Sequence, residues 1–287
     1  MKYSNPQIPE GINTSKQHPL KEFFMLTAGV LGLIVAAVLL LGFFADKLAH
    51  HIPFEVELKI ASKELLEASE PGPMQSYLEG LTERIVSAQA LPEEMPITVH
   101  YVDDDTVNAF ATLGGHIYMF RGLVEQLPNE NALVMVLAHE IAHIKHRHPI
   151  RSLGRGVIIG LALSMLSGTM GDMMANQIVS NTGMVTSLTF SRDQERESDK
   201  TALETLMALY GNVVGADQLF KVLQEAGGAM EVPEFFSTHP LSEKRIQHIH
   251  AFGRELSPST AEAQATPLPL EFPNWLSLEA DENDHEQ

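Results

Sequence analysis

The chain of 287 residues contains no cysteine, and its 19 lysines and arginines are far outnumbered by 37 aspartates and glutamates. The lack of cysteine excludes disulfides, thiolate catalysis, cysteine-type zinc fingers and iron–sulfur sites. The formal charge of −18 argues against nucleic acid as a partner, because a nucleic-acid-binding protein needs a basic surface. With 44% hydrophobic residues, the chain is nevertheless able to bury a core.

One long stretch without charged side chains lies near the N-terminus. Residues 23–45, FFMLTAGVLGLIVAAVLLLGFFA, carry no charge over 23 positions. As a helix they extend about 35 Å, enough to cross a hydrocarbon core of about 30 Å. A core helix of this length usually carries a polar face, and a cleaved signal peptide has a shorter apolar region that ends in an Ala-x-Ala-like site. The stretch therefore predicts a single transmembrane helix with membrane lipid as its partner.

The basic residues beside this helix give its orientation a slight bias. Lys16 and Lys21 lie near its N-terminal edge, which favours that side as cytoplasmic. The bulk of the chain then lies on the opposite side. For a bacterial cell this predicts an inner-membrane protein whose main domain is periplasmic.

Hydrophobic periodicity predicts an α+β fold after the apolar stretch. Residues 54–90 show the spacing of two amphipathic helices. A long helix is predicted at residues 130–148, with Asn129 as its N-cap and Pro149 as its stop. Three strands are also predicted, at residues 96–102, 108–112 and 116–120.

Two later segments differ from this domain in composition. Residues 156–191 carry one charge and five of the 13 methionines. They predict either a helical pair packed on the domain or a lid or surface that rests on a membrane. From Glu255 onward there is no lysine or arginine, but there are eight acidic residues and four prolines, which predicts a disordered acidic tail.

The chain is thus predicted to have four parts. They are a short N-terminal segment, a transmembrane helix, a folded domain and an acidic tail, at residues 1–22, 23–45, 46–255 and 256–287.

The long helix contains the motif HExxH, as His139-Glu140-Ile141-Ala142-His143. Residues four apart lie on one face of a helix, so both imidazoles can reach one metal ion. Glu140 lies beside them, where it can take a proton from the attacking water. The motif also occurs by chance on ordinary helices, but here apolar residues give the helix a buried face that would hold the ligands rigidly.

A catalytic zinc usually has three protein ligands and one open position. A metzincin would need Gly at position 146 and His at position 149, but this chain has His146 and Pro149. A later helix offers Glu195 and Asp199, which are four residues apart and share a face. One can bind metal while the other hydrogen-bonds a ligand histidine, although such a charged run is also typical of a solvated helix face.

Several further stretches extend the pattern over residues 54–254. They are Asn108-Ala109-Phe110-Ala111, Gly114-Gly115-His116-Ile117-Tyr118, Arg121-Gly122-Leu123, the HEIAHIKHRH run, Ser191 to Asp199, and His239-Pro240 followed by Arg245. With these blocks in this order, the chain resembles the HtpX-like and BepA-like zinc metallopeptidases of peptidase family M48. It departs from them at Leu113, where relatives often have Pro, and at Ser198, where they usually have Ala. Neither position is a presumed ligand.

The resemblance implies a gluzincin fold, which is a mainly helical zincin-type domain with a small mixed sheet. It implies one Zn²⁺ per chain, held by His139, His143 and Glu195, with Glu140 as general base. It places Asp199, His239 and Arg245 near the reaction, Asp199 to orient a ligand histidine and either His239 or Arg245 to stabilise the oxyanion. In some relatives the second His-Pro motif is thought to cap the zinc and keep the enzyme latent. Apart from the resemblance, His146 is predicted to have a supporting or surface role, and His116 and His148 a structural one.

The predicted function is that of a membrane-anchored zinc metalloendopeptidase which cleaves unfolded or misfolded polypeptides in quality control of envelope or membrane proteins. The alternative is a membrane-anchored chaperone or adaptor that holds zinc structurally and cuts nothing. A site-two-type intramembrane protease is a weaker alternative, because Lys145, Arg147 and Arg151 crowd the end of the motif helix, where such an enzyme needs lipid.

Overall fold

The computed structural model describes residues 19–49, 51–61, 72–167, 188–221, 235–239, 243–256 and 263–276. Most of the predicted N-terminal segment, the second part of residues 156–191 and the last residues of the acidic tail lie outside the described residues. The elements are α1 (Pro19–Ala49), α2 (Phe54–Ala61), α3 (Pro73–Ala88), β1 (Thr98–Val102), β2 (Ala109–Ala111), η1 (Leu113–Gly115), β3 (His116–Phe120), α4 (Arg121–Val124), α5 (Glu130–Lys145), α6 (His148–Ser167), α9 (Arg192–Tyr210), α11 (Phe235–Thr238) and α12 (Glu243–Leu256).

The three strands form one mixed sheet in the order β1-β3-β2. β1 runs parallel to β3 and β2 runs antiparallel to it, so that β2 is an edge strand. The turn into β3 requires glycine. Gly115 has φ +84, and a Cβ at this position would lie 1.9 Å from the carbonyl oxygen of Pro96.

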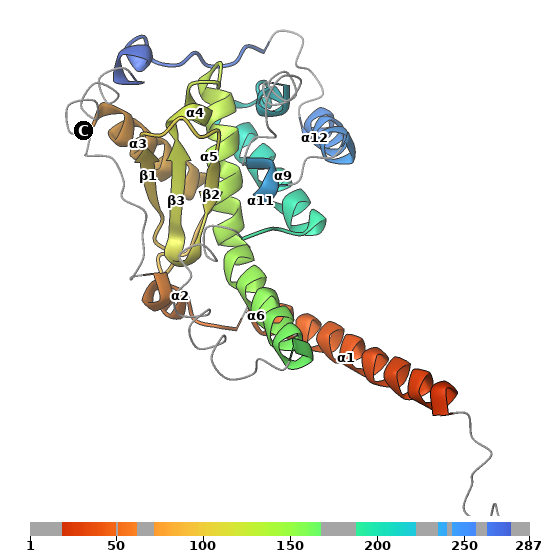
Figure 1. Ribbon diagram of the computed structural model, residues 1–287. Coiled ribbons are helices and arrows are strands. Elements are labelled where there is room, and N and C mark those ends of the chain that lie inside the picture. Colours follow the sequence, from red (N-terminus) through yellow and green to blue (C-terminus); the bar gives the residue numbers. More distant parts are fainter. Residues whose placement is uncertain are drawn as a thin grey trace, which may run out of the picture.

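Helices cover one face of this sheet (Figure 1). β1 alternates in burial, and Val99, Ile117 and Met119 join one core with Leu81 of α3 and Leu137 of α5. Helix α9 packs along the other side of α5. The predicted class, a mainly helical α+β domain with a small mixed sheet, is confirmed.

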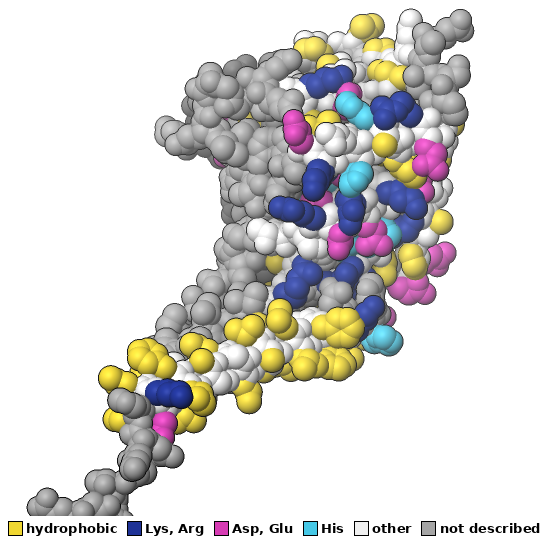
Figure 2. Space-filling view, turned by 90° about the vertical axis from the view of Figure 1, so that its right-hand side faces the viewer, with side chains coloured by type: hydrophobic (Ala, Val, Ile, Leu, Met, Phe, Trp, Pro, Cys, Tyr) yellow, Lys and Arg dark blue, Asp and Glu magenta, His cyan; other side chains and the backbone are white. Residues whose placement is uncertain are grey.

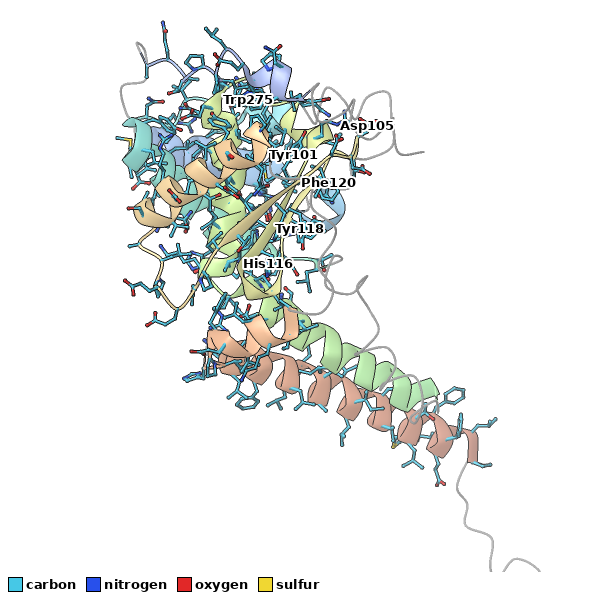
Figure 3. The ribbon with its side chains drawn as sticks, turned by 90° about the vertical axis from the view of Figure 1, so that its left-hand side faces the viewer. Tyr101, Asp105, His116, Tyr118, Phe120 and Trp275 are labelled. Atoms are coloured by element: carbon cyan, nitrogen blue, oxygen red, sulfur yellow. The ribbon has the colours of Figure 1, made fainter. Side chains whose placement is uncertain are left out.

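Aromatic and imidazole side chains line the opposite face of the sheet. Tyr118 and Phe120 lie on β3 together with His116, and all three are labelled in Figure 3. His100 of β1 stacks on His116 with centroids 5.2 Å apart, and the two rings are joined by a nitrogen–nitrogen contact of 3.0 Å. This pairing gives His116 the structural place that the sequence predicted.

Helix α1 contains the predicted span of residues 23–45 and extends it at both ends. Its best window has a mean hydropathy of 2.7, and among the described residues it is the one helix long and apolar enough to cross a membrane. Its large side chains are exposed, as the apolar rod in Figure 2 shows. Such a surface requires an apolar solvent.

The motif helix ends about one turn earlier than the sequence predicted, and the chain bends there before α6 continues away from the sheet (Figure 1). Asn129 is the N-cap, as expected. The helix ends at Lys145, however, and α6 begins at His148, so Pro149 opens the next helix, where its missing N–H costs little. Arg147 makes the corner with φ 60.

A buried ion pair holds this corner to the membrane-proximal part of the chain. The Nε atom of Arg147 lies 2.7 Å from Oε1 of Glu57 in α2, and its Nη2 donates to the carbonyl oxygen of Ile52. The guanidinium also lies over the ring of Phe54. The end of the motif helix is therefore fixed to the segment that follows α1.

Part of the predicted disordered tail is packed on the domain. Phe272 is buried, and its ring and that of Trp275 contact Tyr77 of α3. The backbone of Thr266 exchanges hydrogen bonds with the start of α5. The prediction of disorder is thus wrong for residues 263–276, because average composition hides two aromatic side chains that find a site on the core.

Candidate metal centre

Helix α5 holds the residues of the HExxH motif inside the core. All of its residues except Lys145 are buried, and the side chain of Asn129 accepts a hydrogen bond from an amide of its first turn. His139 and His143 lie one turn apart, with 2.9 Å between their Nε2 atoms. Packing on every side of the helix fixes where the two rings point.

Helix α9 brings a carboxylate to the same place. It starts with a capping box formed by Ser191 and Gln194, which fixes its first turn. α9 packs along α5. Oε1 of Glu195 consequently lies 3.5 Å from Nε2 of His143, and Oε2 lies 3.5 Å from Nε2 of His139.

The segment that follows α11 supplies a fourth possible donor. Nδ1 of His239 lies 3.1 Å from Oε1 of Glu195 and 3.4 Å from Nε2 of His139. The ring is buried and stacks on Phe235. The donor atoms of His139, His143, Glu195 and His239 all lie within 4.8 Å of one another.

The spacing of these donors fits zinc. Tetrahedral zinc with bonds of 2.0–2.1 Å to nitrogen and oxygen separates its ligand atoms by about 3.3 Å. The separations above lie between 2.9 and 3.5 Å. Histidine and glutamate are also among the ligands that zinc prefers.

The buried charge fits a divalent cation as well. Three carboxylates are buried here, those of Glu140, Glu195 and Asp199, against the single guanidinium of Arg245. With neutral imidazoles, two negative charges remain without a partner in a region that excludes water, which is strongly unfavourable. One Zn²⁺ would balance them.

The pKa values respond to the same excess of negative charge. Burial by itself lowers the pKa of His139, but the carboxylates of Asp199 and Glu195 outweigh burial and raise this pKa to about 9. Burial and the neighbouring His139 hold the pKa of His143 well below its usual value. Burial raises the pKa of Glu140.

Asp199 and Arg245 contact the donor residues on the side away from the centre of the cluster. Oδ1 of Asp199 lies 3.0 Å from Nδ1 of His139, close enough for the carboxylate to favour a proton on Nδ1, which would leave the lone pair on Nε2. Arg245 binds the same carboxylate through Nε and Nη2 at 2.6 and 2.8 Å, and its Nη1 lies 2.5 Å from Oε2 of Glu195. The guanidinium is thus engaged by two carboxylates, which favours a positioning role over the oxyanion contact that the sequence suggested for it.

His148 orients the second histidine, a role that the sequence did not reveal. Its Nδ1 lies 2.9 Å from Nδ1 of His143, and its Nε2 lies 3.1 Å from Oε2 of Glu197. The ring is buried, and burial lowers its pKa to about 2. A neutral His148 that donates to Glu197 through Nε2 can accept the proton of His143 Nδ1 and leave the lone pair of His143 on Nε2. The closely spaced histidines of HIKHRH were the available signal, but only the corner at Arg147 shows which of them turns inward.

Glu140 lies beside the donors. Its carboxylate is wholly buried, and Oε1 lies 3.5 Å from Nε2 of His239. Neither carboxylate oxygen of Glu140 has a hydrogen-bond partner among the described residues, and α5 packs against the edge strand β2. A buried acid between the donors and a free strand edge has the position that a base for a bound peptide requires.

A cleft of about 510 Å³ lies beside the cluster between α9 and α12, and Phe190, Glu195 and Arg245 form part of its wall. Phe190 stacks on the ring of His143 with centroids 3.9 Å apart. The cluster itself lies in the core of the domain, where α5 is packed between the sheet and α9. This location disagrees with an intramembrane protease, which would carry the motif on a membrane helix.

Comparison with known proteins agrees with this geometry. The model of the family described as "Peptidase family M48" matches residues 74–252. "Mitochondrial metalloendopeptidase OMA1" of Schizosaccharomyces pombe is 30% identical over 180 residues, which cover 62% of this chain and 52% of that protein. "Beta-barrel assembly-enhancing protease" of Escherichia coli is 26% identical over 200 residues, covering 65% and 40%. The protein of the same description from Yersinia pestis is 28% identical over 202 residues, covering 66% and 41%. The chain therefore matches about half or less of the length of these relatives.

The metal ligands are tested by zinc content. We expect about one zinc for each purified full-length chain in detergent, and loss of most of it in Glu195→Ala, because that carboxylate joins the two histidines at the cluster. Glu204→Ala on the exposed face of the same helix is the control and is expected to keep its zinc. A folded parent chain that contains no zinc would refute the site.

The role of His148 is tested by zinc affinity, measured by competition with a chelator. We expect His148→Ala to weaken zinc binding about 10–100-fold, the usual effect of removing a partner that orients a ligand. His148→Asn, which keeps a hydrogen-bonding side chain, is expected to recover part of the loss. Equal affinity in the parent chain and in His148→Ala would show that the contact with His143 has no such effect.

Proposed function

The chain belongs to peptidase family M48, and from this premise we propose that it is a membrane-anchored zinc metalloendopeptidase. The observation that carries the proposal is the buried cluster of His139, His143 and Glu195 with Glu140 beside it. The names of the relatives, which include a metalloendopeptidase and a protease, support the same class of reaction.

When bound, zinc supplies a water of lowered pKa and polarises the carbonyl group of the peptide. Glu140 accepts the proton of the attacking water and passes it to the leaving amine. Burial raises the pKa of Glu140, which makes its carboxylate a better proton acceptor near neutral pH. Asp199 and His148 hold the imidazoles of His139 and His143 in the tautomer that the ligands need.

The edge strand β2 is the place where a substrate backbone can pair. β3 uses both of its edges, for β1 and β2, and this excludes it as the pairing strand. Ala111 lies opposite Ile117 in the pairing of β2 with β3. The backbone hydrogen bonds that flank this pairing join Asn108 to Phe120 and Thr112 to His116. The backbone groups of Ala109 and Ala111 therefore point to the free edge. An extended peptide added there lies against Glu140.

Main-chain pairing reads little of a substrate's sequence. Such a site accepts segments that are extended and accessible, and folded proteins offer few of these. We propose unfolded or misfolded polypeptides as substrates, and quality control of membrane or envelope proteins as the purpose. With α1 as a single-pass anchor, the slight basic excess at Lys16 and Lys21 favours a domain on the side opposite the cytoplasm, which is the periplasm of a bacterial cell.

His239 makes the described arrangement a latent one. It occupies the fourth position of the cluster, where a catalytic site needs an opening. The segment that carries it also contacts the edge strand, since the amide of Phe235 donates to the carbonyl oxygen of Val107. Movement of this single segment would free both the fourth position and the strand edge.

The second candidate function is a zinc-holding chaperone or adaptor that cuts nothing, and the closed set of four donors is the observation in its favour. A structural zinc site has four protein ligands. It has no use, however, for a fully buried Glu140, whose desolvation is unfavourable. The presence of this acid favours the enzyme.

Replacement of the base tests the reaction. We expect Glu140→Gln to lower hydrolysis of an unfolded protein such as casein by about 10²-fold or more and to keep its zinc. The variant is measured in the parent chain and in the His239→Ala background, so that latency does not hide the effect. Full activity of Glu140→Gln in either background would contradict the mechanism.

Opening of the fourth position tests latency. We expect His239→Ala to hydrolyse casein faster than the parent while zinc remains bound, because three ligands remain. His250→Ala, at an exposed position of α12, serves as the control and is expected to behave like the parent. Loss of zinc without any gain of hydrolysis would favour the structural site of the second candidate.

A further inference from the structure

Helix α6 connects the candidate metal centre with the membrane anchor. Its first residue, His148, contacts His143. From there the helix runs back along α1, and the two lie side by side in both views (Figures 1 and 3). The junction is fixed by a small apolar cluster in which Ala49 of α1 meets Ile150 and Leu153 of α6.

The exposure of α1 agrees with this packing. Most of its side chains are exposed, for example Leu33 at 72%. The partly covered positions fall on one face at helical spacing. They are Ile34, Ala37, Val38 and Gly42. A single covered stripe is expected where one neighbouring helix lies along a rod that is otherwise open.

The composition of α6 changes along its length. Arg151 and Arg155 lie in its first two turns, and no charged residue follows from Gly156 to Ser167. The apolar part carries small residues at intervals of four, at Gly156, Gly160 and Ser164. Such spacing is typical of helices that pack against each other in lipid.

The charged end of α6 lies at the level where α1 leaves the membrane. Ile150 and Leu153 meet the last turn of α1, next to the exposed Lys47. Basic side chains gather at this junction (Figure 2), and lysine and arginine are the residues that sit among lipid headgroups. The apolar part of α6 therefore starts at the depth at which the apolar part of α1 ends.

We infer that the apolar half of α6, residues 156–167, lies inside the bilayer beside α1, with lipid as its partner. This inference rests on the proposed membrane anchoring by α1. As a helix the segment extends about 18 Å, so it enters a hydrocarbon core of about 30 Å without crossing it. The helix that starts at the metal centre thus continues into lipid.

This position of α6 brings the candidate metal centre close to the membrane surface, which limits the substrates that can reach it. Seven residues separate His148 from Arg155, which is about 10 Å of helix. His148, which contacts the candidate ligand His143, then lies about 10 Å along the helix from the headgroup level, and the candidate metal centre lies just beyond it. The class of substrate that fits this position is an extended polypeptide segment held at the membrane surface, such as a loop or terminus of a membrane protein.

Depth-dependent quenching tests the inference in the full-length chain. The absence of cysteine allows single-cysteine variants with one fluorescent label each, at Ile158→Cys and Leu163→Cys in α6. Leu33→Cys in the middle of α1 and Glu83→Cys on the exposed face of α3 serve as lipid and water references. The labelled proteins are reconstituted in vesicles of phosphatidylcholine and phosphatidylglycerol. Quenching is measured with iodide in the water and with spin labels on the lipid chains.

We expect the label at position 163 to behave like the label at position 33, which is quenched by the spin-labelled lipid and not by iodide. The label at position 158 is expected to lie closer to the headgroups. The label at position 83 is expected to be quenched by iodide alone. The inference would be overturned if iodide quenched the label at position 163 as strongly as the label at position 83 while the label at position 33 was quenched from the lipid. The membrane anchoring by α1 would then still stand. Protection of 163 from both quenchers would also overturn it, in favour of contact with protein such as a second copy. Iodide quenching of 33 would instead refute the membrane anchoring on which both proposals depend. Equal zinc content of all variants verifies that each has folded.

Discussion

The structure depends on keeping several charges out of water at one point in the core. Glu140, Glu195 and Asp199 are all buried where α5 meets α9, and among the described residues Arg245 is the one guanidinium that contacts them. Carboxylates so close together repel one another, and water cannot screen them. A divalent cation would balance these charges, and the imidazoles and Glu195 are spaced to receive one. The rigid packing of α5 against the sheet and α9 is what holds these groups together.

The supporting residues follow from the same constraint. Each histidine of the motif must present Nε2 to the centre, so each needs an acceptor for its Nδ1 proton. Asp199 fulfils this for His139, and His148 with Glu197 behind it fulfils it for His143. The corner at Arg147, fixed by the ion pair with Glu57, is what turns His148 inward. The segment next to the anchor therefore contributes to the geometry of a metal ligand.

The cluster is connected to the apolar helix α1 through α6. α1 exposes an apolar surface long enough to cross a membrane, and α6 runs from that surface to the cluster. A peptidase that recognises only extended main chain needs another source of selectivity. The proposed position of the site at the bilayer surface would provide one, because it would limit which chains can reach the free edge of β2.

The sequence by itself determined the local features. The charge-free run from Phe23 to Ala45, the N-cap at Asn129, the glycine pair before β3 and the spacing of HExxH each depend on residues close in the chain, where helical or strand periodicity sets the geometry. Only the tertiary structure decided how distant residues meet. It placed Glu195 at the histidines and Asp199 behind His139, engaged Arg245 with two carboxylates, and made His148 a support for His143. It also showed that Phe272 and Trp275 pack on the core although the composition around them predicts disorder. These outcomes depend on helix packing and on a single backbone corner with φ 60 at Arg147, and periodicity contains no information about either, because both arise from contacts between segments far apart in the chain.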